Sequence, residues 1–145
     1  MRFNLRRTKT IPEATLDLPE VGPRASLRGR LATEANPPYY NAMLKLSSKR
    51  LREVARGRLS AEMIAKNRGE DATLYPRFVI TGWTGIEDES GAAIEFSVDA
   101  CTEFLAQLTK EASWIFDRVR NFFGSPENFL ADEDLPPEGE VVAKN

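Results

Sequence analysis

The stretch SVDACTEFLAQLTKEASWIFDRVRNFFG, residues 97–124, decides the fold class. Ser97 is a good helix cap, and Asp99 suits the positive end of the helix dipole. Apolar residues then recur at helical spacing, namely Val98, Cys101, Phe104, Leu105 and Leu108. A second set follows from about Glu111 and ends at Gly124, namely Trp114, Ile115, Val119, Phe122 and Phe123. The stretch predicts two consecutive amphipathic helices.

Upstream of this stretch the pattern predicts two more helices. Asn36 followed by two prolines is a good helix start, and apolar residues recur at helical spacing up to Ala55. Gly57 breaks this helix. Ser60 caps a second, short helix that we expect to end near Gly69.

Between the two helical pairs the sequence favours extended structure. Residues 75–83, YPRFVITGW, mix β-branched and aromatic side chains and indicate a short strand or a buried connector, with a helix as the open alternative. Residues 85–91 are polar and rich in turn formers. Ile86 before this turn, and Ile94 and Phe96 after it, indicate a β-hairpin or an extended loop.

The two ends of the chain differ from the middle. Residues 1–35 are rich in arginine, threonine and proline, and we expect an extended basic arm with one or two short β-strands. Residues 36–130 should form a mainly helical domain. Residues 131–145 are predicted to be a disordered acidic tail. The expected fold class is therefore mainly α with a small β element (α+β).

The composition argues against catalysis. None of the 145 residues is histidine, so the commonest general base and a frequent zinc ligand are missing. The single cysteine, Cys101, falls in a helical apolar register and is expected to be a buried thiol in a reducing compartment. The acidic run at 87–89 lacks the spacing of a calcium loop. We expect no enzyme activity, no metal and no cofactor.

Charge is distributed unevenly along the chain. Residues 1–60 hold 13 basic and 5 acidic residues, a net charge of +8, whereas residues 61–145 hold 7 and 17, a net charge of −10. Such asymmetry suits head-to-tail association of copies, or the folding of one half of the chain against the other. The arginines could also contact phosphates, but no stacking aromatics lie between them, which makes nucleic acid the weaker expectation.

The sequence resembles a family of small phage proteins. The matching segments are FVITGWTGIEDESG (78–91), IEFS (94–97), WIF (114–116) and PENFL (126–130). They are similar to the pattern of tail assembly chaperones of long-tailed phages and prophages: an apolar stretch, W-x-G-[IV]-x-D-x-x-G, a serine- or proline-led helix and a final N-F. The resemblance covers about residues 36–130 and leaves out the arginine-rich beginning.

The resemblance implies a role in assembly and gives no catalytic residues. The expected partners are the tape-measure protein, whose apolar helices would be kept soluble, and the tail-tube protein that polymerises around it. We also expect a homo-oligomer. The expected location is the bacterial host cytoplasm, since neither a signal peptide nor a membrane-spanning stretch is present. The candidate partner-binding residues are Trp83, Trp114, Phe122 and Phe129, with core packing as the alternative role of each.

Two other functions stay open from the sequence. One is a nucleic-acid-binding or regulatory phage protein that uses the arginine-rich first half of the chain. The other is a structural head or tail completion protein that remains in the particle.

Overall fold

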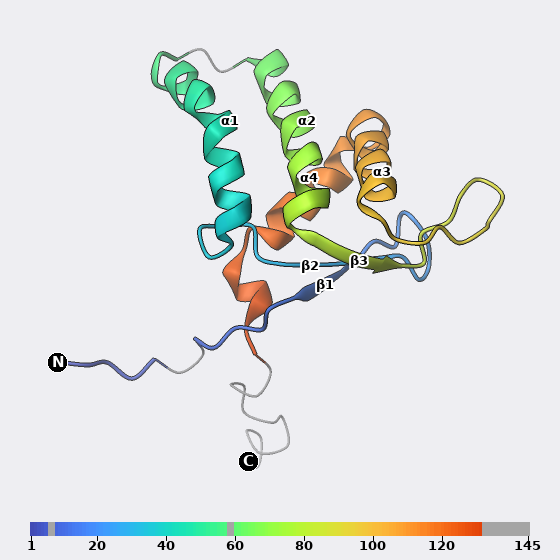
Figure 1. Ribbon diagram of the computed structural model, residues 1–145, viewed down its shortest axis with the longest axis horizontal. Coiled ribbons are helices and arrows are strands. Elements are labelled where there is room, and N and C mark those ends of the chain that lie inside the picture. Colours follow the sequence, from blue (N-terminus) through green and yellow to red (C-terminus); the bar gives the residue numbers. More distant parts are fainter. Residues whose placement is uncertain (6–7, 58–59, 132–145) are drawn as a thin grey trace.

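The chain folds as a small antiparallel sheet covered by helices (Figure 1). The computed structural model describes residues 1–5, 8–57 and 60–131, and the side chains of residues 47–51 and 53–55 are outside this description. In chain order the elements are β1 (Ala14–Asp17), β2 (Ser26–Gly29), α1 (Pro37–Ala55), α2 (Ala61–Phe78), β3 (Ile80–Thr84), α3 (Val98–Glu111), α4 (Ser113–Phe123) and the 3-10 helix η1 (Pro126–Phe129). The expected α+β class is confirmed.

The sheet joins the beginning of the chain to its middle. Its order is β1-β2-β3 and both pairings are antiparallel, with Leu16 opposite Leu27 and Leu27 opposite Trp83. Both strands within residues 1–35 avoid that segment's prolines, which would remove ladder hydrogen bonds. Leu18 and Leu27 are completely buried. Residues 14–29 therefore share one core with the helices.

Helix α2 is longer than predicted, and the expected end near Gly69 is wrong. The helix runs on to Phe78, and its second half is the buried half, from Asp71 to Pro76. The Tyr75 ring packs edge-on against the rings of Tyr39 and Phe116, with centroids 5.8 Å apart in each pair. Burial of this half outweighs the weak helix propensity of glycine. Pro76, which cannot donate a helical hydrogen bond, precedes the helix end by two residues.

The two helices predicted from residues 97–124 are confirmed. The Ser97 side chain caps α3 by accepting a hydrogen bond from the Ala100 amide at 2.9 Å, and Gly124 follows α4. One detail of the predicted apolar face of α4 is wrong. Phe116 is fully buried, whereas Trp114 is 56% exposed. The buried face of α4 consists of Ile115, Phe116, Val119 and Phe123.

Cys101 lies in the core on α3, as predicted. Burial disfavours the thiolate and raises the pKa of this thiol to about 12. A protonated, enclosed thiol is a poor nucleophile. Cys101 therefore contributes to packing in this structure.

The chain enters and leaves the folded body at one place. Thr10 forms an isolated antiparallel bridge with Leu130, and the Ala131 amide donates to the Lys9 carbonyl at 2.9 Å. The acidic tail was predicted for residues 131–145. Apart from Ala131, it lies outside the residues that the structure describes. Among the helices described, none has the length and apolar character needed to cross a bilayer.

We predict that Gly85→Ala destabilises the protein, with Gly69→Ala as the matched control. Gly85 has a φ of +70°, and an added Cβ would lie against the backbone of Arg24. We therefore expect the free energy of unfolding to fall by at least about 1–2 kcal/mol. Gly69 lies inside α2 with open space around it. Alanine at this position should raise the free energy of unfolding by about 0.5–1 kcal/mol. Urea denaturation measures both changes. Equal effects of the two substitutions would contradict this account of the Gly85 turn.

Candidate protein-binding groove

A groove that combines apolar and acidic residues runs along α3. It consists of two adjoining depressions of about 350 and 290 Å³, which share Ile86, Glu87, Phe104 and Gln107. The first depression extends to Trp83 and Ile94. The second extends past Leu108 to Ala112 and Ile115, at the start of α4. We call the two together the α3 groove.

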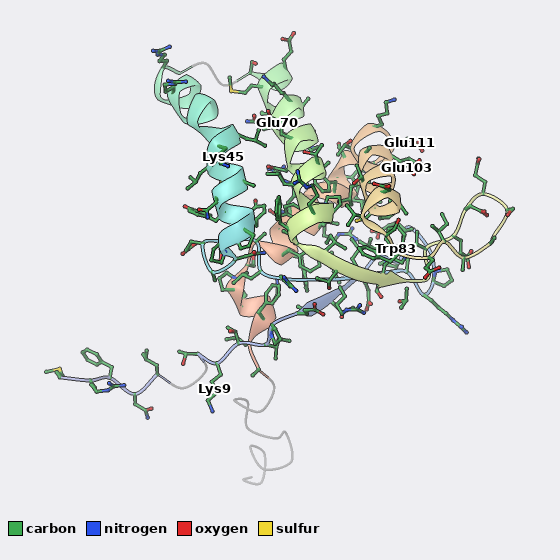
Figure 2. All side chains as sticks on the ribbon, viewed as in Figure 1. Lys9, Lys45, Glu70, Trp83, Glu103 and Glu111 are labelled. Atoms are coloured by element: carbon green, nitrogen blue, oxygen red, sulfur yellow. The ribbon has the colours of Figure 1, made fainter. Side chains whose placement is uncertain are left out.

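Aromatic packing fixes the Trp83 end of the α3 groove. Trp83 lies on β3, and its ring makes edge-to-face contacts with Phe96 and Phe104 at centroid distances of 5.2 and 5.6 Å. Its indole N–H donates to the Ile94 carbonyl at 2.8 Å. This bond ties the loop after β3 to Trp83, whose ring packs against Phe104 of α3; Trp83 is labelled in Figure 2. Trp83 is therefore both a structural anchor and a partly exposed wall of the groove.

The acidic loop beside Trp83 is a rigid turn. The Asp88 carboxylate accepts hydrogen bonds from the Ser90 amide (2.9 Å), the Ser90 hydroxyl (2.6 Å) and the Ala92 amide (3.0 Å). These bonds, led by the one from the Ser90 side chain, hold the pKa of Asp88 below its usual range. The turn closes through Gly91 at a φ of +87°. Over the described parts of the chain, no group of three or more candidate ligands could hold a metal ion.

Carboxylates surround the apolar floor of the α3 groove. Glu87 and Glu89 come from the loop, and Glu103 and Glu111 come from α3. All four residues are exposed, and the two on α3 are labelled in Figure 2. An apolar floor with a single sign of charge at its rim favours a ligand that is apolar in the centre and basic at its edges.

An ion pair supports the second end of the groove. Arg118 on α4 donates two hydrogen bonds to the Glu20 carboxylate, at 2.7 and 2.5 Å, and its guanidinium lies 5.6 Å from the centre of the Trp114 ring. The Arg118 hydrogen bonds lower the pKa of Glu20 to about 2. Glu20 lies in the connection between β1 and β2, so this pair ties that connection to α4.

The structure separates the four predicted partner-binding residues. Trp83 lines the α3 groove, and Trp114 is exposed beside Ile115 at its second end. Phe122 is half-buried and packs against the rings of Phe123 and Phe129. Phe129 is only 1% exposed, so in this state it has a core role. The groove thus contains one of the four residues and lies next to a second.

Sequence reasoning missed most of the groove lining. Ile86 and Ile94 were recognised only as residues that flank a turn, and Phe104 only as part of a helix face. The useful signal was the combination of apolar residues on both sides of the turn with carboxylates on α3. These residues form one groove only because Trp83 bonds to the loop and packs against α3, which the sequence pattern does not show.

A second cluster of charged side chains joins α2 to α4. Arg68 makes a two-pronged contact with Asp117, with both distances 2.9 Å, and Arg120 binds the buried Asp71 at 2.7 Å. Arg120 also approaches Asp117 at 3.4 Å. Because both carboxylates are engaged by arginines, the cluster is suited to fixing the helices and not to acid–base chemistry.

The comparisons with known proteins give one match. A family model described as YdaY prophage protein matches residues 34–134. This range contains all four α-helices, β3 and the whole α3 groove except Glu20 and Val21, and it leaves out β1 and β2. No curated protein and no solved structure matches the chain.

The Glu20–Arg118 pair predicts a specific pH dependence. Because the pKa of Glu20 is lowered from 4.5 to about 2 on folding, the pair stabilises the folded state above pH 4.5, and this contribution disappears as the pH falls toward 2. An NMR titration of the Glu20 carboxyl carbon should give a midpoint near 2. In Arg118→Gln the midpoint should rise toward 4.5. An unchanged midpoint in the variant would show that Arg118 does not cause the shift.

Proposed function

This chain belongs to the YdaY prophage protein family, and we propose that it acts as a phage tail assembly chaperone whose α3 groove binds a helix of the tape-measure protein. The observation that carries the proposal is the acidic rim around the apolar floor of the groove. Phage origin narrows the possible roles to those that a phage genome encodes. Among these roles, the apolar and acidic groove favours protein binding.

The shape and chemistry of the groove fit an amphipathic helix. Its floor is formed by side chains that a helix could cover with one apolar stripe, including Trp83, Phe104 and Ile115. The rim carboxylates would then pair with lysine or arginine residues on either side of that stripe. This is the helix-in-groove mode of recognition, in which apolar anchors give affinity and flanking charges give orientation.

The exposed charges also suit the temporary contact that a chaperone makes. Long-range attraction between a carboxylate rim and a basic ligand raises the association rate, and it is screened by salt. Contacts at an exposed rim contribute little to residence time. A client helix held in this way could be protected during synthesis and released when tail-tube subunits assemble around it.

The remaining features support action by binding alone. The sequence has no histidine, and Cys101 is buried with its pKa raised to about 12. The carboxylates of Asp71 and Asp117 are both engaged by arginines. These features fit a protein that functions by binding other proteins and not by catalysis.

The decisive experiment is co-expression of the chain with the tape-measure protein of the same prophage, followed by affinity capture and light scattering. The wild-type chain should yield a soluble complex. The double substitution Glu87→Lys/Glu103→Lys should lower the recovered tape-measure protein at least about tenfold, because the rim then repels a basic ligand. Glu62→Lys/Glu127→Lys makes the same change in net charge away from the groove and should have little effect.

Other results would point elsewhere. Equal recovery with both double variants would exclude the groove as the site. Retention of nucleic acid in a strongly salt-dependent manner, without the tape-measure protein, would replace the chaperone role by a nucleic-acid-binding one. Presence of the chain in purified particles would favour a structural completion protein.

A further inference from the structure

The first residues of the chain combine apolar and basic side chains, and residues 1–5 are exposed. In residues 1–9, which we call the leading segment, Phe3 is 77% exposed and Leu5 is 71% exposed. In an extended backbone, side chains two positions apart lie on the same side, so Phe3 and Leu5 would form one apolar edge. The segment also contains Arg2, Arg6, Arg7 and Lys9 and no acidic residue.

The leading segment starts far from the groove of its own chain. It leaves the body where the Ile11 amide donates to the Phe129 carbonyl at 2.7 Å, next to η1. Figure 2 shows Lys9 at this exit, on one side of the molecule, and Trp83, Glu103 and Glu111 on the other side. Residues 1–5 lie on the opposite side of the molecule from α3 (Figure 1). The apolar edge of the leading segment is therefore presented to other molecules.

The segment and the α3 groove are complementary in both respects that matter for docking. The segment offers two large apolar side chains flanked by positive charges. The groove offers an apolar floor flanked by Glu87, Glu89 and Glu103. We propose that the leading segment of one copy binds the α3 groove of a second copy.

The position of the two surfaces determines the type of association. Each copy would use its leading segment on one side and its groove on the other, which is a heterologous, head-to-tail contact. Repetition of such a contact gives a closed ring if the rotation between successive copies adds up to a full turn, and an open chain of copies if it does not. Only a short segment is buried in each contact, so the association should be reversible and should depend on protein concentration and on salt.

This inference rests on the proposed function, because it uses the same groove. It adds a second ligand for that groove, the leading segment of another copy. The leading segment and a client helix would compete for the groove, so a bound client would reduce self-association through that contact. Self-association would in turn cover the apolar floor while no client is present.

Two measurements on the full chain test the inference. Sedimentation velocity should show a mass that rises with concentration for the wild-type chain and stays that of a monomer for Phe3→Ser/Leu5→Ser. Asn4→Ser, between the two apolar positions, is the control and should behave as the wild type. A labelled peptide of residues 1–9 should bind the Phe3→Ser/Leu5→Ser chain, whose own segment cannot compete. Adding Glu87→Lys/Glu103→Lys should weaken that binding at least about tenfold.

The inference is overturned if Phe3→Ser/Leu5→Ser associates as strongly as the wild type, or if the peptide binds the charge-reversed groove equally well. Failure here is distinguishable from failure of the proposed function. If the peptide binds and the tape-measure protein is not captured, self-association stands and the chaperone role falls. If the tape-measure protein is captured through the groove and the peptide does not bind, only the present inference falls.

Discussion

The packing of Phe123 against β2 is the contact on which the rest of the structure depends. An added Cβ on Gly29 would lie only 3.0 Å from the Phe123 ring and 2.8 Å from the Val79 carbonyl oxygen, so the helix and the strand can approach this closely only over a glycine. The backbone reinforces the contact, because the Ala32 amide donates to the Phe123 carbonyl at 2.7 Å. Phe123 also touches the rings of Phe122 and Phe129. This one side chain thus connects the sheet, α4 and η1.

The charged residues fall into two groups with different physical roles. Between α2 and α4, Asp71, Asp117, Arg68 and Arg120 neutralise one another, and only Asp71 of the four is buried. Ion pairs of this kind add little net stability, but a packing that left the buried Asp71 carboxylate without Arg120 would be penalised, so the cluster favours one arrangement of α2 and α4. Outside, the carboxylates around the α3 groove are left toward solvent. Two further pairs lie at the surface: Arg28 with Glu13 within the first half of the chain, and Arg118 of the second half with Glu20 of the first.

Local signals in the sequence were enough to predict the helices but not their depth of burial. Ser97 and Gly124 mark real helix boundaries because capping depends on neighbouring backbone groups. Gly69 misled the prediction of where α2 ends, because the cost of glycine in a helix is offset by the burial of the following turns, which include Tyr75. Trp114 was expected on the apolar face of α4 and Phe116 was left out of it, because the periodicity of one short helix does not fix its rotation to within one residue. The α3 groove required contacts between β3, the following loop and α3, and such contacts between distant segments leave no periodic pattern in the sequence.

The antiparallel bridge at the entry and exit of the chain has a mechanical consequence. Lys9 and Ala131 are direct neighbours, so a force that draws the two exits apart would load the bonds of this bridge one after another, as a zipper is opened, and would not shear them together. Zipper loading gives way at low force. The backbone bonds that join residues 9–11 to residues 129–131 would therefore break one at a time under such a force.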